Sequence, residues 1–161
     1  MSAAAEALLV VKVQEQDFDL AAELRPLSAG RAQVGAVANF VGLVRGRDSA
    51  DASREIAAME LEHYPGMTER SLRRIAEEAA ARWPLSGVVI IHRYGPLRVG
   101  DQIVLAAASS AHRGAALEAC AFLMDYLKTD APFWKREIAP DGSGAWVDAR
   151  DEDDAAKARW R

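Results

Sequence analysis

The sequence has almost no cysteine, because Cys120 is the one thiol among its 161 residues. One thiol cannot form an internal bridge, so a disulfide scaffold is excluded and we expect a reducing, cytoplasmic environment. Long apolar runs are missing too, since no stretch approaches the roughly 18 uninterrupted apolar residues that a membrane span needs. We therefore predict a protein without a membrane-spanning segment.

An excess of positive charge is also absent. The 20 lysines and arginines are outnumbered by 24 aspartates and glutamates, and the net charge is −4. This balance argues against a general nucleic-acid binder, which needs a basic surface. Metal-binding spacing is missing as well: His63 and His92 have neither an i, i+4 partner nor a neighbouring cysteine, so we interpret them as ordinary hydrogen-bonding histidines. We predict no metal site and no resident cofactor.

The remaining composition, with 50% hydrophobic and 27% charged residues, is that of an ordinary globular protein. Its length points to a single domain over residues 1–161. Apolar or alternating runs predict strands over 8–13, 34–44, 56–62, 88–91 and 102–108, and a hairpin over 133–147. Helical stripes predict helices over 18–24, 68–83 with Thr68 as cap, 110–128 and, at the C-terminus, 151–161. These elements do not alternate as βαβ units, which favours an α+β fold with a mainly antiparallel sheet and two long helices packed on it.

The junction at residues 104–113, VLAAASSAHR, is a candidate anion site. A strand is predicted to lead there into a helix whose first turn holds Ser109, Ser110, His112 and Arg113. Free N–H groups and the positive end of the helix dipole attract phosphate or carboxylate, and an arginine adds a bidentate donor. The same residues also fit a plainer interpretation, in which Ser110 caps the helix while His112 and Arg113 are solvated.

Lysine is scarce in this chain, with four lysines against 16 arginines. Lys128 ends a predicted helix on a stripe with Leu117, Ala121 and Met124, and Lys135 follows it across a proline turn. Two amines held together against apolar surface lose a proton more readily, and a neutral amine can act as nucleophile or proton acceptor. Alternatively, Lys128 only complements the helix dipole, and Lys135 lies on a solvated strand face.

Arg45 directly follows the apolar run 34–44, where the chain turns into a basic loop. At the mouth of a buried strand, its guanidinium group can clamp a phosphate. A solvated loop arginine is the plainer alternative, and the residue pattern leaves both open.

Five segments together resemble the large, catalytic subunit of molybdopterin synthase. They are LEHYPGMTE at 61–69, RWPL at 82–85, IHRYGPL at 91–97, SAHR at 110–113 and MDYLKTDAPFWKRE at 124–137. That family adds two sulfurs to a cyclic pyranopterin monophosphate and so forms the dithiolene that later holds molybdenum. The sulfur arrives as a thiocarboxylate on the C-terminal Gly-Gly of a small ubiquitin-like partner subunit. The resemblance therefore implies a sulfurtransferase of molybdenum cofactor biosynthesis.

The resemblance also implies roles for particular residues. Lys128 and Lys135 match the family's reacting centre, where the partner's tail enters. The positions that match its substrate-binding residues are Arg45, His112, Arg113, Phe40 and Met124. His112 and Arg113 would reach the pocket across a homodimer interface, while Phe40 and Met124 would form apolar walls. The family assembles as a large-subunit dimer with one small subunit at each end, which implies a heterotetramer.

Two other interpretations remain open. A non-catalytic dimeric module that binds an anion or nucleotide would use the same arginines without any chemistry. A lysine Schiff-base enzyme would act alone on a carbonyl substrate, so borohydride would trap an adduct without a partner protein.

Overall fold

A computed structural model describes residues 6–47, 51–147 and 151–161, and its central layer is a four-stranded sheet. Its strands are, in spatial order, β1 (Leu8–Gln14), β4 (Leu85–Arg93), β6 (Gln102–Ser110) and β2 (Ala36–Leu43). Strand β6 runs antiparallel to both of its neighbours, whereas β1 runs parallel to β4. The strands predicted in these four regions are confirmed, and pairing extends three of them beyond their apolar runs.

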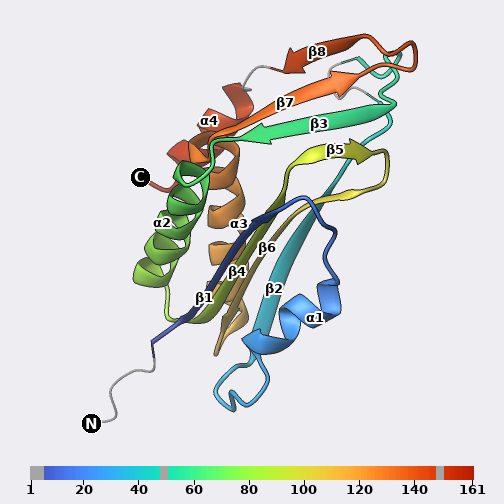
Figure 1. Cartoon of the computed structure of the whole chain (residues 1–161). Coiled ribbons are helices and arrows are strands. Elements are labelled where there is room, and N and C mark those ends of the chain that lie inside the picture. The colour runs from blue at the N-terminus through green and yellow to red at the C-terminus, as the bar shows by residue number, and fades with distance from the viewer. Residues whose placement is uncertain (1–5, 48–50, 148–150) are drawn as a thin grey trace.

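A second four-stranded sheet lies across one end of the first (Figure 1). Its strands, all antiparallel, are β5 (Gly95–Arg98), β3 (Ala58–His63), β7 (Phe133–Ile138) and β8 (Gly144–Val147). The sequence predicted one sheet, so this division is a correction. The chain leaves the first sheet at Gly95, whose φ of +84° lies in the left-handed region that favours glycine. Sequence patterns do not predict β5, because Pro96 interrupts its four residues.

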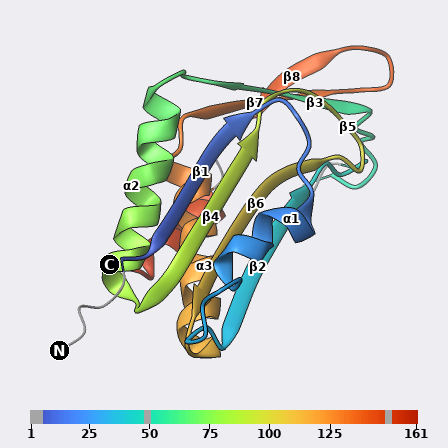
Figure 2. The same cartoon turned by 60° about the horizontal axis from the view of Figure 1, so that its bottom comes forward.

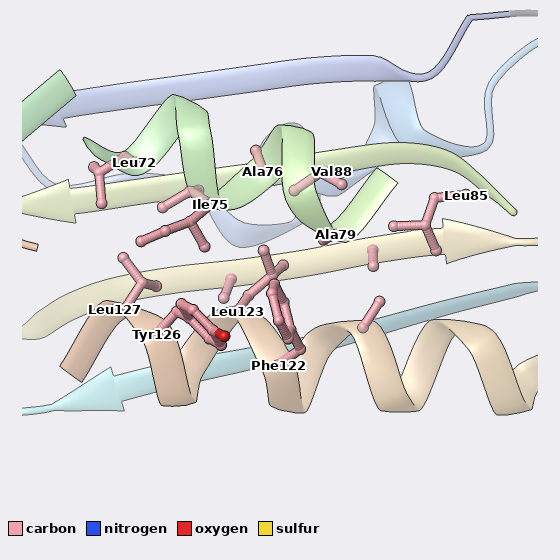
Figure 3. Packing of buried hydrophobic residues seen from close by; sticks show 14 of the residues in the cluster. Leu72, Ile75, Ala76, Ala79, Leu85, Val88, Phe122, Leu123, Tyr126 and Leu127 are labelled. Atoms are coloured by element: carbon pink, nitrogen blue, oxygen red, sulfur yellow. The ribbon is translucent and has the colours of Figure 1, made fainter. Parts of the chain in front are cut away.

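Two long helices, α2 (Met67–Arg82) and α3 (Arg113–Asp130), cover one face of the first sheet. Figure 3 shows how Leu72 of α2 and Phe122 of α3 point into the cluster between the helices and the sheet. Both side chains are fully buried, as is Val88 of β4 beneath them. The predicted α+β class and its two packed helices are therefore confirmed.

The opposite face of the first sheet is covered by shorter helical elements (Figure 2). Helix α1 (Leu20–Leu24) and the 3-10 turn Arg25–Leu27 lie there, and Leu27 is fully buried against the strands. Within the described ranges, no helix is long and apolar enough to cross a membrane.

Helix α3 begins three residues later than predicted, at Arg113. Ser109 and Ser110 stay in β6, because the strand pairs there with both β2 and β4. Ser110 is buried and its hydroxyl donates to the Pro84 carbonyl at 2.9 Å, so it does not cap the helix. The N-cap is His112, whose side chain makes no capping hydrogen bond.

Helix α2 also begins differently from the prediction. Its N-cap is Gly66, with a φ of +82°, and the Gly66 N–H donates to the Glu69 carboxylate at 2.6 Å. Thr68 is buried within the first turn, where its hydroxyl donates to the Tyr64 carbonyl. A glycine cap with positive φ replaces the expected threonine cap because the preceding turn enters the helix in a left-handed conformation.

A fourth helix, α4 (Asp151–Ala158), packs against α3. Just beyond it, the Trp160 indole N–H donates to the Asp125 carboxylate of α3 at 2.6 Å. The Trp160 ring also meets Trp83 and Phe122 edge-on. These contacts hold the C-terminal segment beside the last turns of α3.

Candidate active site

A pocket of about 630 Å³ opens between the C-terminal part of α3, the edge strand β2 and the inner face of the second sheet. This volume suits a small-molecule ligand. Its apolar lining includes Ile56, Met59, Leu61, Ile103, Val104 and Leu127. Its ionisable lining consists of Arg45, His92, Lys128, Lys135, Glu137, Glu152 and Asp153. A smaller hollow of about 420 Å³ beside β1 and α2 has no basic side chain, so the larger pocket is the better candidate for an anionic ligand.

The pocket brings together most of the site residues that the sequence predicted. Those that line it are Lys128, Lys135, Arg45, Phe40 and Met124. They come from α3, β7, β2 and the loop after β2, which are far apart in the sequence. This convergence agrees with the predicted neighbourhood of the two lysines and Arg45.

His112 and Arg113 lie at the other end of α3 and do not line the pocket. Both are exposed. Arg113 and Lys128 are 15 positions apart on the helix, which separates the two Cα atoms by about 22 Å along the axis. Within one chain, His112 and Arg113 therefore cannot contact a small ligand held at Lys128.

Lys128 stands in the last turn of α3 with its side chain exposed. The described chain offers it no hydrogen bond or ion pair. The predicted stripe of Leu117, Ala121 and Met124 is not the buried face of the helix, since Leu117 is 60% exposed. The core side carries Ala116, Ala119, Cys120, Phe122, Leu123, Tyr126 and Leu127. Lys128 thus continues an outer face, which leaves its amino group available to a ligand.

Lys135 has a buried acidic partner, Glu137, that sequence reasoning missed. Alternate residues of β7 point the same way, so both side chains enter the pocket. The Lys135 Nζ and the Glu137 Oε1 are 3.6 Å apart, and the Glu137 side chain is only 7% exposed. A buried carboxylate is costly without a charged partner, so this pair holds Lys135 at the wall. The spacing of two in the sequence KRE is the signal that places them together.

His92 is the second pocket residue whose role the sequence did not indicate. It follows Val88 and Ile90 on the helix-facing side of β4, and its ring stacks on Phe133 with centroids 3.7 Å apart. Its Nδ1 lies 2.8 Å from the Arg93 carbonyl oxygen. The pKa of His92 is lowered from 6.5 to about 4, chiefly by burial and to a smaller extent by the charges of Lys128 and His63, against the opposing effect of the hydrogen bond with Arg93. The ring is therefore neutral at physiological pH.

Comparison with known proteins gives one consistent family. The family model described as MoaE protein matches residues 13–130. A molybdopterin synthase catalytic subunit from Mesorhizobium japonicum is 55% identical over 152 residues, which cover 94% of this chain and 92% of the relative. The solved MoaE protein of Burkholderia ambifaria has a TM-score of 0.79 at 53% identity and covers 95% and 98% of the two chains. A chain in the Helicobacter pylori complex of subunits 1 and 2 of molybdopterin-converting factor shares the fold at 22% identity, with a TM-score of 0.64 over 90% and 92% of the chains.

Proposed function

Because the chain belongs to the MoaE protein family, we propose that its pocket carries out the sulfur transfer that forms molybdopterin. Curated relatives of the chain are molybdopterin synthase catalytic subunits. The substrate in this proposal is a cyclic pyranopterin monophosphate, and the sulfur donor is the thiocarboxylate of a small partner subunit. The observation that supports it most directly is the shared pocket of Lys128, Lys135 and Arg45. Three basic side chains in a partly apolar cavity suit two anionic reactants.

The two lysines serve the reacting atoms. A charged ammonium group stabilises the thiocarboxylate and the oxyanion that develops when its acyl carbon is attacked. A neutral amine accepts a proton during attack or forms an acyl adduct. Because Lys135 is paired with Glu137 and Lys128 is unpaired in the described chain, Lys128 is the better placed of the two to take part in proton movement.

The remaining pocket residues bind the substrate. Arg45 is exposed at the rim, where a guanidinium group pairs with a phosphate through two parallel hydrogen bonds. Phe40 and Met124 supply apolar surface beside a flat pterin ring.

A second copy of the chain completes the site in this proposal. His112 and Arg113 are about 22 Å from Lys128 along their own helix, so they serve the pocket of a neighbouring protomer. Exposed apolar side chains on β2 and α3 support an interface between copies; they are Val37, Phe40, Leu43 and Leu117. A two-fold axis would then place His112 and Arg113 of the other copy beside each of the two pockets.

A small ubiquitin-like subunit with a C-terminal Gly-Gly thiocarboxylate binds each end of this dimer in the proposed heterotetramer. Its extended tail is slim enough to enter the pocket because glycine has no side chain. We place this assembly in the cytoplasm, where the buried Cys120 stays a free thiol.

The decisive test is Lys128→Ala in the complete two-subunit enzyme. We expect dithiolene formation to fall by about 100-fold or more, while the affinity for the pterin phosphate stays within about twofold. Lys157→Ala is the matched control, because Lys157 pairs with Asp130 on the surface and does not line the pocket. Unchanged turnover in Lys128→Ala would contradict the proposal and favour a non-catalytic anion-binding module. A borohydride-trapped adduct without the partner subunit would favour a Schiff-base enzyme instead.

A further inference from the structure

His92 is the one imidazole that lines the pocket in the described ranges. Its ring is fixed on two sides, by the nearly parallel stack on Phe133 (17° between planes) and by the 2.8 Å hydrogen bond of Nδ1 with the Arg93 carbonyl. A side chain held in this way has given up its rotational freedom before any ligand binds. The geometry is that of a group kept in one orientation.

The hydrogen bond to Arg93 also fixes which ring nitrogen carries the proton. A carbonyl oxygen only accepts, so Nδ1 donates and the neutral ring keeps its lone pair on Nε2. No described residue donates a hydrogen bond to that second nitrogen. His92 therefore presents a free acceptor in a pocket whose other nitrogen groups are donors.

The reactants of the proposed function offer little to such an acceptor at their charged ends. A phosphate and a thiocarboxylate both accept hydrogen bonds, so neither can pair with Nε2. The Lys128 amino group is a donor without a partner in the described chain, and Lys128 lines the same pocket as His92, whose imidazole its charge affects. A long exposed lysine side chain also loses rotamer entropy when it is ordered, so it benefits from a fixed partner.

We propose that His92 is a positioning residue for Lys128, with Nε2 accepting a hydrogen bond from the Lys128 amino group and directing it toward the reacting atoms. This inference rests on the proposed function, because it assigns Lys128 a reacting atom to meet. His92 itself touches neither the sulfur nor the substrate. Its contribution is the orientation of another side chain.

The neutral state of His92 is part of this arrangement. A protonated ring would lose its acceptor and place a second positive charge beside Lys128. The titratable and charged groups around it are Lys128 of α3, His63 of β3, Lys135 and Glu137 of β7, Arg45 after β2, and Glu152 and Asp153 of α4. Protonation of His92 should therefore lower turnover on the acidic side of the pH profile.

Two substitutions distinguish the contribution of the Nε2 hydrogen-bond acceptor from that of the stacked ring. His92→Phe keeps an aromatic ring on Phe133 but removes both nitrogens, whereas His92→Gln loses the ring and keeps an amide oxygen near the position of Nε2. In the complete two-subunit enzyme, we expect kcat to fall about tenfold or more in His92→Phe with KM within about twofold, and to stay within about threefold of wild type in His92→Gln. The fall in turnover at low pH that comes from protonation of His92 should be absent in His92→Gln.

Other outcomes would overturn the proposal. Wild-type turnover in His92→Phe means that the acceptor is not needed, and a raised KM with unchanged kcat means that His92 contacts the substrate. Greater damage in His92→Gln than in His92→Phe means that the ring matters only for packing.

A measurement without His92 variants guards against variants that fail to fold. The ¹⁵N resonance of His92 Nε2 in the wild-type protein should shift in Lys128→Ala and stay in place in the control Lys157→Ala. An unchanged resonance would overturn the contact. If that resonance responds but the wild-type enzyme transfers no sulfur, the contact is supported and the proposed function fails. If the wild-type enzyme is active and the resonance does not respond, only the role of His92 fails.

Discussion

Two ionisable residues on the pocket wall, the buried Glu137 and the half-buried His92, are accommodated by different physical means. Glu137 keeps a charged partner, since the Lys135 ammonium lies 3.6 Å from its carboxylate. His92 avoids charge altogether, because burial lowers its pKa to about 4. An unpaired buried charge would cost several kcal/mol, and neither residue incurs that cost at neutral pH. The wall therefore presents one ion pair and one neutral acceptor to whatever enters.

The burial of His92 predicts how stability depends on pH. The unfolded chain takes up a proton near pH 6.5, but the folded chain does so only near pH 4, so acidification in this window favours unfolding. We expect the free energy of unfolding to fall by up to about 1.4 kcal/mol for each pH unit. Asp17 and Asp141, whose pKa values are lowered from 3.8, lose their contribution only at lower pH.

Urea titrations at several pH values between 4 and 6.5 measure this slope. The matched variant is His92→Phe, which has no proton to take up and should show a flatter dependence over the same window. A slope that is identical in both proteins would show that another group is responsible.

Among the elements, α3 has two separate faces with different tasks. Phe122 and Leu123 pack into the core, Met124 and Lys128 line the pocket, and Leu127 lies where the two meet. The helix is apolar on more than its core side, because the stripe of Leu117, Ala121 and Met124 lies apart from its fully buried residues. An apolar stripe indicates burial in some interface, and this one runs from the exposed Leu117 to Met124 at the edge of the chain's own core.

The C-terminal segment depends on one aromatic anchor. Trp160 packs against Trp83 and Phe122 and donates to Asp125, so its removal should lower the free energy of unfolding by about 2 kcal/mol. Chemical denaturation of Trp160→Ala measures this loss. The control is Trp146→Ala, since Trp146 is 59% exposed on β8 and should change stability by less than about 0.5 kcal/mol. Equal effects in both variants would contradict an anchoring role for Trp160.

Local patterns in the sequence were enough to predict the strands of the first sheet and both long helices. They could not predict where pairing continues: Ser109 and Ser110 look like helix-starting residues but lie between two neighbouring strands. The strand over 56–62 and the hairpin over 133–147 were predicted, but their separation into a second sheet was missed for a related reason, because the β3–β7 pairing joins Ala58 to Ile138 across 80 positions of the chain. Such contacts are decided by the whole fold, and no short window of sequence contains them.

The candidate site was predictable where residue type alone carried the signal. Scarce lysines and the segment 124–137 drew attention to Lys128 and Lys135, and both line the pocket. Glu137 and His92 were missed because the burial of the first and the ring stacking of the second depend on elements that are distant in sequence. A histidine in a strand looks the same whether it faces water or a stacked phenylalanine.

At the scale of the whole molecule, the basic residues assigned to one substrate lie at opposite ends of α3. Arg45, Lys128 and Lys135 share the pocket, whereas His112 and Arg113 are exposed about 22 Å from Lys128. If all five serve one ligand, each pocket must combine residues of two chains. This requirement is stronger than dimerisation alone, because it specifies which chain supplies which residue.

Mixed dimers test that requirement directly. Chains with Arg113→Ala and chains with Lys128→Ala should each be nearly inactive as homodimers. In a heterodimer, one pocket combines the intact Lys128 of the first chain with the intact Arg113 of the second, while the other pocket carries both substitutions. Purified heterodimers, made with two affinity tags, should therefore recover about half of the wild-type turnover, measured with saturating partner subunit. If each pocket used its own Arg113, both pockets would carry one substitution, and the heterodimer would be as inactive as either parent.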